Sequence, residues 1–191
     1  MRRLIAGFKV SIDGKIEGPD GYADWVETWS EEYGLTQQID ACILGGKMYV
    51  GYEKYWTAIQ NSDGQPLPMT GKFPTQEEVE WAQVAAKTPH YVLSRTLTEA
   101  QWPKTRFLRS VDEVAALKQK PGKDIYLMGG AGIASALIDA GLVDELRLFV
   151  YPLIAGPGKA LFTTVAQRRK LQLQKVQQLQ DGRVNLIYGI A

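Results

Sequence analysis

Residues 124–141 of the chain read DIYLMGGAGIASALIDAG, and this stretch predicts a strand that runs into glycines and then into a helix. Asp124 to Met128 is a short apolar run typical of a buried strand. Gly129-Gly130-Ala131-Gly132 is expected to turn the chain into a helix from Ile133 to Ala140, which ends at Gly141. Glycines let a ligand approach the backbone, and the free N–H groups of a helix N-terminus suit a pyrophosphate. The pattern is G-G-x-G rather than G-x-G-x-x-G, so a tight turn or close helix packing explains it equally well.

Strands and helices alternate on both sides of this stretch. The other expected strands are Leu4–Val10, Ala41–Leu44, Tyr91–Leu93, Thr105–Leu108 and Glu145–Tyr151. The other expected helices are one that begins at Ser30 and ends before Asp40, then Lys47–Tyr55, Thr75–Ala86 and Val111–Lys118. Lys170–Gln178 and Val184–Ile190 are expected to form a terminal hairpin around Asp181-Gly182. The order predicts a single α/β domain over residues 1–191, with a mostly parallel central sheet, helices on both faces and a C-terminal antiparallel hairpin.

The composition excludes several classes of function. Lys plus Arg total 22 and Asp plus Glu total 21, so there is no broad basic surface for nucleic acid or an anionic membrane. Cys42 and His90 are the single cysteine and histidine, which argues against a transition-metal site. The N-terminus does not resemble a signal peptide, and no apolar run approaches the roughly 20 residues that span a bilayer. A cytoplasmic protein is therefore expected.

Two further strand-to-helix junctions carry groups that suit phosphate. One is Leu44 to Met48, and the other is the strand end at Ser94-Arg95-Thr96, which offers two hydroxyls and a guanidinium. Open α/β sheets bind ligands at the carboxyl ends of their strands. Lys47 and Arg95 are candidates for binding the 2′-phosphate of NADPH, although for a single residue an ordinary surface charge is the more frequent explanation. Hydride transfer from such a cofactor would explain why no nucleophile or acid–base set is evident.

Several segments resemble one known family. Gly129 to Phe162 combines Gly129-Gly130, a Leu142 to Leu146 run, Pro152, Gly156-Pro157-Gly158 and Leu161-Phe162, and this order is similar to the reductase half of the bifunctional riboflavin-biosynthesis deaminase–reductase. The segments Val10 to Gly14, Asp40 to Gly45 and Tyr91 to Leu97 look like other motifs of the same family. The resemblance runs from Leu4 to Ile190.

The resemblance implies a dihydrofolate-reductase-like fold, a small-molecule substrate and NADPH as cofactor. The positions that match the cofactor site are Gly7, Ile16, Gly45, Gly46, Lys47, Met48, Ser94, Arg95, Thr96, Gly129, Gly130, Ala131, Gly132 and Ile133. Gly7 and Ile16 would lie near the nicotinamide. Trp25 matches a tryptophan of the mobile loop that covers the site, and Trp25, Ser30 and Tyr49 are the expected substrate residues. A core position for Trp25 is an equally good explanation.

The chain departs from the family pattern at the positions that would decide its cofactor and substrate. Members often carry Arg and Thr where this chain has Gly46 and Met48, so Lys47 would have to supply the charge. Dihydrofolate reductases place a carboxylate where this chain has Ser30, although Glu27, Glu31 or Glu32 could substitute. These departures argue against folate. A role in riboflavin synthesis is unsupported, because the Asp-x-Pro stretch typical of that pathway's reductase is absent after the second strand, residues 30–40 have no Arg or Lys, and the zinc pattern of the deaminase half does not occur.

Aromatic residues follow helical spacing after the second junction, at Tyr49, Tyr52, Tyr55 and Trp56. Core packing of that helix is the favoured interpretation, and an aromatic wall for a flat heterocyclic substrate is the other.

Two hypotheses follow from the sequence. The first is an NADPH-dependent reductase that transfers a hydride to a C=N or C=O bond of a small pterin- or pyrimidine-like substrate. The second is a noncatalytic nucleotide-binding or interaction protein that kept the fold. A flavin- or NADH-using Rossmann enzyme fits poorly because the glycine turn comes late in the chain. A homodimer through the Glu145–Tyr151 strand and the residue 170–190 hairpin is a further expectation.

Overall fold

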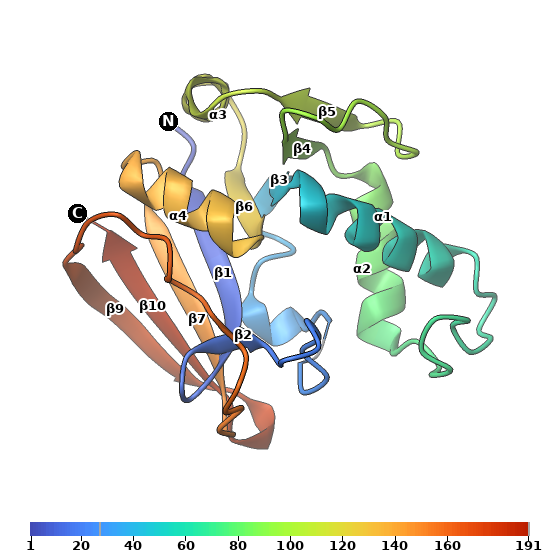
Figure 1. Cartoon of the computed structure of the whole chain (residues 1–191). Coiled ribbons are helices and arrows are strands. Elements are labelled where there is room, and N and C mark those ends of the chain that lie inside the picture. Colours follow the sequence, from blue (N-terminus) through green and yellow to red (C-terminus); the bar gives the residue numbers. More distant parts are fainter. Residues whose placement is uncertain (27, 191) are drawn as a thin grey trace.

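The computed structural model describes residues 1–26 and 28–190 and contains an eight-stranded sheet with helices on both faces (Figure 1). The strand order is β5-β4-β3-β6-β1-β7-β10-β9. These strands are β1 (Leu4–Ser11), β3 (Ile39–Gly45), β4 (His90–Leu93), β5 (Thr105–Leu108), β6 (Asp124–Gly129), β7 (Glu145–Tyr151), β9 (Leu171–Gln178) and β10 (Val184–Ile190). The first six strands in this order, from β5 at the edge to β7, pair in parallel with their neighbours. The strand β10 pairs antiparallel with both β7 and β9. The predicted fold class is confirmed.

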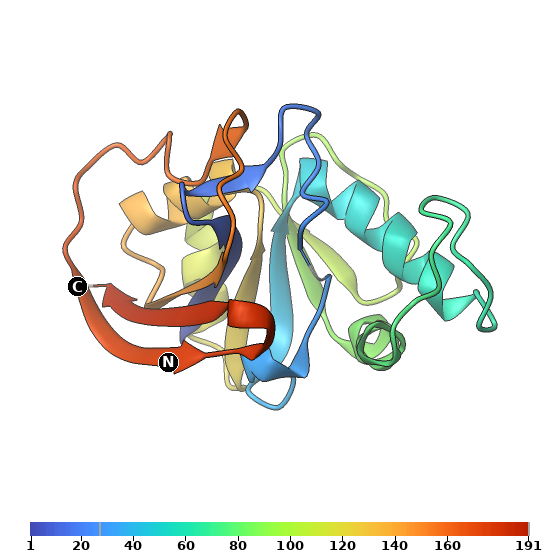
Figure 2. The ribbon, with the colours of Figure 1, turned by 90° about the horizontal axis from the view of Figure 1, so that it is seen from below.

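The sheet separates two apolar cores. On one face lie α1 (Gly46–Gln60) and α2 (Gln76–Lys87), and on the other lie α3 (Val111–Lys118) and α4 (Ala131–Asp139), as Figure 2 shows. Alternate residues of β1 serve the two sides, with Ile5 in the first core and Leu4, Ala6 and Phe8 in the second. A parallel strand covered on both faces has no solvated side, which is why β1 is apolar at nearly every position.

Local sequence signals fix the helix ends. Thr75 caps α2 and forms a reciprocal capping box with Glu78, as predicted. The helices α1 and α4 each begin earlier than expected, at Gly46 and Ala131, because the glycine pairs form the ends of the strands and the helix caps themselves. The junctions are therefore tighter than the sequence predicted.

The helix predicted from Ser30 to Asp40 is wrong. Ser30 does act as an N-cap and accepts a hydrogen bond from the Glu32 N–H, but only a 3-10 turn from Glu31 to Tyr33 follows. Gly34 then adopts a left-handed conformation with φ of 64°, which ends the turn. The chain runs on in turns to β3. A small two-stranded sheet, β2 (Lys15–Glu17) with β8 (Lys159–Ala160), was not predicted.

No helix among residues 1–26 and 28–190 is long and apolar enough to span a bilayer.

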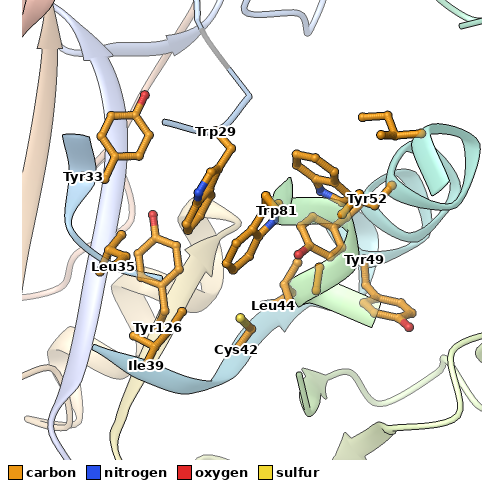
Figure 3. Packing of buried hydrophobic residues seen from close by; sticks show 14 of the residues in the cluster. Trp29, Tyr33, Leu35, Ile39, Cys42, Leu44, Tyr49, Tyr52, Trp81 and Tyr126 are labelled. Atoms are coloured by element: carbon orange, nitrogen blue, oxygen red, sulfur yellow. The ribbon is translucent and has the colours of Figure 1, made fainter. Parts of the chain in front are cut away.

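Aromatic side chains fill the first core beside the centre of the sheet. Trp29 stacks on Trp81 of α2 with ring centroids 3.5 Å apart, and its edge meets the ring of Tyr126 on β6 (Figure 3). Such aromatic pairs are worth roughly 0.5–1.5 kcal/mol beyond the area they bury. This cluster joins the segment before β3 to the sheet and to α2 without a helix in between.

Candidate active site

Three strand ends meet at one edge of the sheet. In the parallel register Gly45 of β3 pairs with Leu93 of β4, and Leu44 of β3 pairs with Gly129 of β6. The three predicted junctions, which begin at Gly45, Ser94 and Gly129, are therefore neighbours in space. The structure thus brings together the three junctions that the rule for parallel strand ends had grouped.

The N-termini of α1 and α4 begin at this edge. Their N-cap residues are Gly45 and Gly130, and neither helix has a side-chain cap or an acidic residue in its first turn. By contrast, α2 and α3 are capped by side chains and have acidic first turns. The N–H groups of the first turns of α1 and α4 are thus left for water or an anionic ligand.

Packing explains three of the glycines. A Cβ on Gly45 would lie 3.3 Å from the Cγ2 of Ile133, and a Cβ on Gly129 would lie 2.7 Å from the Sδ of Met48. A Cβ on Gly46 would lie 2.6 Å from the Oγ of Ser94. These contacts join α1 to β6, α4 and the end of β4. Close packing therefore accounts for glycine at these three positions.

Packing does not explain the glycines of the α4 turn. Gly130 has φ of 37°, a backbone conformation that favours glycine, so the tight turn accounts for it; an ideal Cβ there would lie 3.7 Å from the Cγ2 of Ile133. Gly132 has nothing within 4 Å of its ideal Cβ position. Gly132 is exposed, whereas Ala131 between them is buried in the core. The backbone at the start of α4 is accordingly accessible to a ligand.

The β4 turn, residues 94–97 after β4, is closed by hydrogen bonds to its own Ser94 side chain. Ser94 is half-buried, and its Oγ accepts hydrogen bonds from the N–H groups of Thr96 and Leu97 at 3.3 and 3.0 Å. Arg95 and Thr96 are exposed at the tip of the turn. Lys47 on the first turn of α1 is exposed as well.

Arg109 was missed by the sequence interpretation. Its Nη1 donates to the carbonyl oxygens of Ser94 and Leu97 at 2.5 and 2.7 Å. The only sequence signal is its place directly after β5, because strands that are parallel neighbours end at the same edge.

The residues expected near the nicotinamide lie on β1 and β2. Gly7 is buried, and a Cβ there would lie 2.6 Å from the Cε2 atom and the hydroxyl of Tyr126. Ile16 on β2 is half-buried and packs against the second core. Gly7 therefore has a packing role whether or not a ligand lies beside it.

Trp25 lines a hollow at the same edge of the sheet. The hollow has a volume of about 280 Å³ and is lined by Trp25, Tyr151, Pro152, Leu153, Asp181 and Arg183. Tyr151 ends β7 and pairs with Ser11 at the end of β1, so the hollow lies beyond these two strand ends. The structure thus places Trp25 in the wall of a hollow beyond the ends of β1 and β7, and the glycine junctions do not line this hollow.

The turn between β1 and β2 is fixed to the segment that follows β7. Asp13 accepts hydrogen bonds from the Ser11 hydroxyl and from the N–H groups of Ala155 and Gly156. The Ser11 bond, followed by these backbone bonds, lowers the pKa of Asp13 to about 2. An ionised Asp13 therefore joins the turn after β1 to the segment that follows β7.

The other expected substrate residues are buried. Ser30 is used as the cap described above. The Tyr49 side chain is buried beside the aromatic cluster (Figure 3). Its hydroxyl donates to Glu53 and lies 2.6 Å from the Oγ1 of Thr105. Tyr52 and Trp56 are buried in the first core too, which favours core packing over an aromatic wall. We therefore place Tyr49 outside the candidate pocket.

The acidic residues that could replace the missing carboxylate have other partners. Glu31 accepts from the Trp29 indole and the Thr36 hydroxyl, and Glu32 accepts from the Arg183 guanidinium. Glu27 lies outside the described residues. In the described part of the chain, no group of three or more His, Cys, Asp or Glu side chains is arranged to hold a metal.

Comparisons with known proteins place the chain in a family. Residues 2–184 match the model of the RibD C-terminal domain. The uncharacterized protein YyaP of Bacillus subtilis is 36% identical over 192 residues, covering 98% of this chain and 94% of its own length. Among solved structures, a putative riboflavin biosynthesis protein from Shewanella sp. PV-4 superposes with a TM-score of 0.70 at 20% identity and 99% coverage of both chains.

The wider fold is that of dihydrofolate reductases. The enzyme from Enterococcus faecalis, solved in complex with NADP(H), matches with a TM-score of 0.61 at 15% identity, over 98% of this chain and 96% of that one. At this identity the likeness concerns the fold alone. Together with the glycine junctions and the parallel sheet described above, the family match shows that the chain belongs to the RibD C-terminal domain family.

Proposed function

We propose that the protein is an NADPH-dependent reductase that transfers a hydride to a C=N or C=O bond of a small heterocyclic substrate, pterin- or pyrimidine-like. The observation that supports this best is the meeting of two uncapped helix N-termini, those of α1 and α4, at one edge of the sheet. One such end suits one phosphate group, whereas two adjacent ends suit an extended anion such as a dinucleotide.

The chain's own residues fit this cofactor in three places. The accessible backbone at Gly130 and Gly132 would take the pyrophosphate at the start of α4. Lys47 and Arg95 would take the 2′-phosphate at the start of α1 and the tip of the β4 turn. The nicotinamide would lie toward Gly7 and Ile16. When bound, the cofactor supplies the hydride, and the protein supplies position and exclusion of water.

The hollow beside Trp25 would receive the substrate. Its walls combine the Trp25 and Tyr151 rings and the Leu153 side chain with the charged groups of Asp181 and Arg183. An apolar pocket with a few polar groups is typical of small-molecule sites. The indole of Trp25 would cover one side of a flat substrate and keep water from the reacting bond.

A noncatalytic nucleotide-binding protein is the second candidate. It is favoured by Gly46 and Met48, which replace the Arg and Thr frequent in the family, and by the capping role of Ser30 where dihydrofolate reductases have a carboxylate. Oxidation of NADPH with any carbonyl, imine or pterin compound would separate the two candidates.

The first experiment is a titration of the purified protein with NADPH and, separately, with NADH, followed by fluorescence and thermal shift. Micromolar binding of NADPH, with weaker binding of NADH, supports the reductase. Arg95→Gln should weaken NADPH binding, whereas Lys54→Gln, an exposed cation further along α1, should leave it unchanged. No binding of either nucleotide would contradict the proposal.

We further propose that two copies of the chain associate through the C-terminal hairpin. The Glu145–Tyr151 strand, β7, was also expected at this interface, but it lies inside the sheet and is paired with β1 and β10. Leu173 and Val176 of the edge strand β9 are 52% and 56% exposed, and Leu171 is 41% exposed. The strand has only one charged side chain, Lys175. Edge strands that carry apolar groups and few charges are prone to pair with another chain.

A further inference from the structure

Arg109 holds the backbone of the β4 turn from outside. It follows β5 directly, and its Nη1 donates to the carbonyl oxygens of Ser94 and Leu97, the residues at the two ends of the turn. A charged donor on a carbonyl makes a stronger hydrogen bond than a neutral one. The two bonds therefore fix the ends of the turn relative to each other.

The side chain of Arg109 is itself held in place. Its guanidinium carbon lies 5.3 Å from the centroid of the Phe107 ring, and its backbone N–H donates to the carboxylate of Glu113 at 3.1 Å. A guanidinium over an aromatic ring gains from the cation–π interaction and loses less freedom when it makes hydrogen bonds. Arg109 is exposed, and its ring contact together with the two carbonyl bonds makes its side chain a brace for the β4 turn.

The brace acts on Arg95 and Thr96. Both are exposed between the two residues that Arg109 contacts, while the Ser94 hydroxyl closes the turn from inside. The turn abuts the start of α1 through the contact of Ser94 with Gly46. The direction of the Arg95 side chain relative to the α1 N-terminus therefore depends on the conformation that Arg109 holds.

Three cations lie at the corner formed by the β4 turn and the first turn of α1. Lys47, Arg95 and Arg109 form no ion pair with a carboxylate within 4 Å in the described part of the chain. The Arg109 guanidinium donates to neutral carbonyl oxygens, so these bonds do not neutralise its charge. The Glu113 carboxylate accepts a hydrogen bond from the backbone N–H of Arg109 and not from its guanidinium. The corner thus presents an excess of positive charge beside the positive end of the α1 dipole.

Position 46 cannot supply this charge in the present arrangement. An arginine there needs a Cβ, and the Ser94 side chain fills that place. We propose that Arg109 is a positioning residue that compensates for the missing arginine, because it holds the β4 turn so that Arg95 and Lys47 bind the 2′-phosphate of NADPH. The inference rests on the proposed function and adds the residue on which selectivity for NADPH over NADH depends.

The test uses the full chain and measures the Kd for NADPH, for NADH, and for the fragment pair adenosine 2′,5′-bisphosphate and ADP. Arg109→Gln should weaken binding of NADPH and of the bisphosphate by about tenfold, the size expected for loss of hydrogen bonds to a charged group. Binding of NADH and ADP should change by less than about twofold, because they have no 2′-phosphate. Arg109→Lys should restore part of the selectivity since it keeps a charged donor.

The control is Arg106→Gln, which removes an exposed cation from β5 of the same corner without touching the turn. It should leave the ratio of the Kd for NADH to the Kd for NADPH unchanged. Phe107→Leu removes the ring under the guanidinium and should lower the ratio less than Arg109→Gln does, and it serves as the alternative variant if Arg109→Gln does not fold.

The outcomes separate the inference from the proposed function. If the wild-type protein binds neither dinucleotide, the proposed function fails. If it binds NADPH but Arg109→Gln keeps the same selectivity, or loses NADPH and NADH binding equally, the positioning role of Arg109 is wrong while the proposed function stands.

Discussion

Ser94 fills the space that a side chain at Gly46 would need: an ideal Cβ on Gly46 lies 2.6 Å from the Ser94 Oγ and 2.7 Å from its Cβ. The first residue of α1 is thus in direct contact with the end of β4. The contact brings the α1 N-terminus and the β4 turn together. It leaves no room for a side chain at position 46.

Two glycines of α1 should respond to alanine in opposite ways. Gly46→Ala should lower the free energy of unfolding by about 1–3 kcal/mol, because the new Cβ overpacks against Ser94. Gly51→Ala should raise it by up to about 1 kcal/mol, because nothing lies within 4 Å of that Cβ and alanine favours the helix. Urea denaturation of both variants is the measurement. Equal effects would mean that α1 does not press against the β4 turn.

Restoring the family arginine should not restore affinity by itself. Gly46→Arg should bind NADPH no better than the wild type, since the side chain must displace the β4 turn. Gly46→Arg combined with Ser94→Gly removes the obstacle but also the hydroxyl that closes the β4 turn, so it should melt at a higher temperature than Gly46→Arg alone without binding NADPH more tightly than the wild type. The Kd for NADPH and the melting temperature of each variant decide this. A single Gly46→Arg variant that binds more tightly than the wild type would contradict the steric argument.

His90 should make the protein less stable in mild acid. It is buried, its Nδ1 contacts the Thr88 carbonyl oxygen and its Nε2 lies 3.1 Å from the Tyr52 hydroxyl. Burial lowers the pKa of His90 to about 4 from the ordinary value of 6.5. The unfolded chain therefore takes up a proton below pH 6.5 that the folded protein does not accept until about pH 4, so stability falls between these values.

The expected loss from pH 7 to pH 4.5 is on the order of 2–3 kcal/mol. Denaturant unfolding at the two values should show it, and His90→Gln should flatten the difference while lowering stability at pH 7. Because the chain has one histidine, a single imidazole resonance reports the titration. A midpoint near 6.5 in the folded protein would show that His90 is not sequestered.

The exposed apolar side chains of β9 should decide whether two copies of the chain form a dimer. If two copies pair through β9, Val176→Lys should shift the protein from dimer to monomer, because it places a charge in the apolar contact. Lys175→Gln, its neighbour, should leave the dimer intact. Sedimentation equilibrium measures both. A wild type that is monomeric at high concentration would remove the proposed interface.

The sequence predicted the central elements because their signals are local. The alternation around residues 124–141 gave β6, the glycine turn and α4, and Thr75 with Glu78 gave the start of α2. The prediction from Ser30 to Asp40 was wrong because a good cap and acidic first turn do not by themselves outweigh Gly34 and the packing of Trp29 and Tyr33 into the first core.

The candidate site was predictable in part. Glycines and hydroxyls at strand ends are visible in the sequence, and parallel strands end at one edge, so Gly45, Ser94 and Gly129 could be grouped in advance. The structure confirms that they are neighbours, while their binding of NADPH stays a prediction. Tyr49 was assigned to the substrate from its place in the chain, but its hydroxyl donates to Glu53 one turn further along α1 and contacts Thr105 of β5.

The sequence by itself determined the fold class, the family resemblance and the positions of the glycine junctions, because periodicity, caps and turns act over a few residues. Only the tertiary structure decided that Ser94 excludes a side chain from Gly46, that Arg109 braces the β4 turn, and that the hollow beside Trp25 has Arg183 in its wall. These relationships join residues far apart in the chain. They depend on strand order and on side-chain packing across elements, which no local pattern of residues specifies.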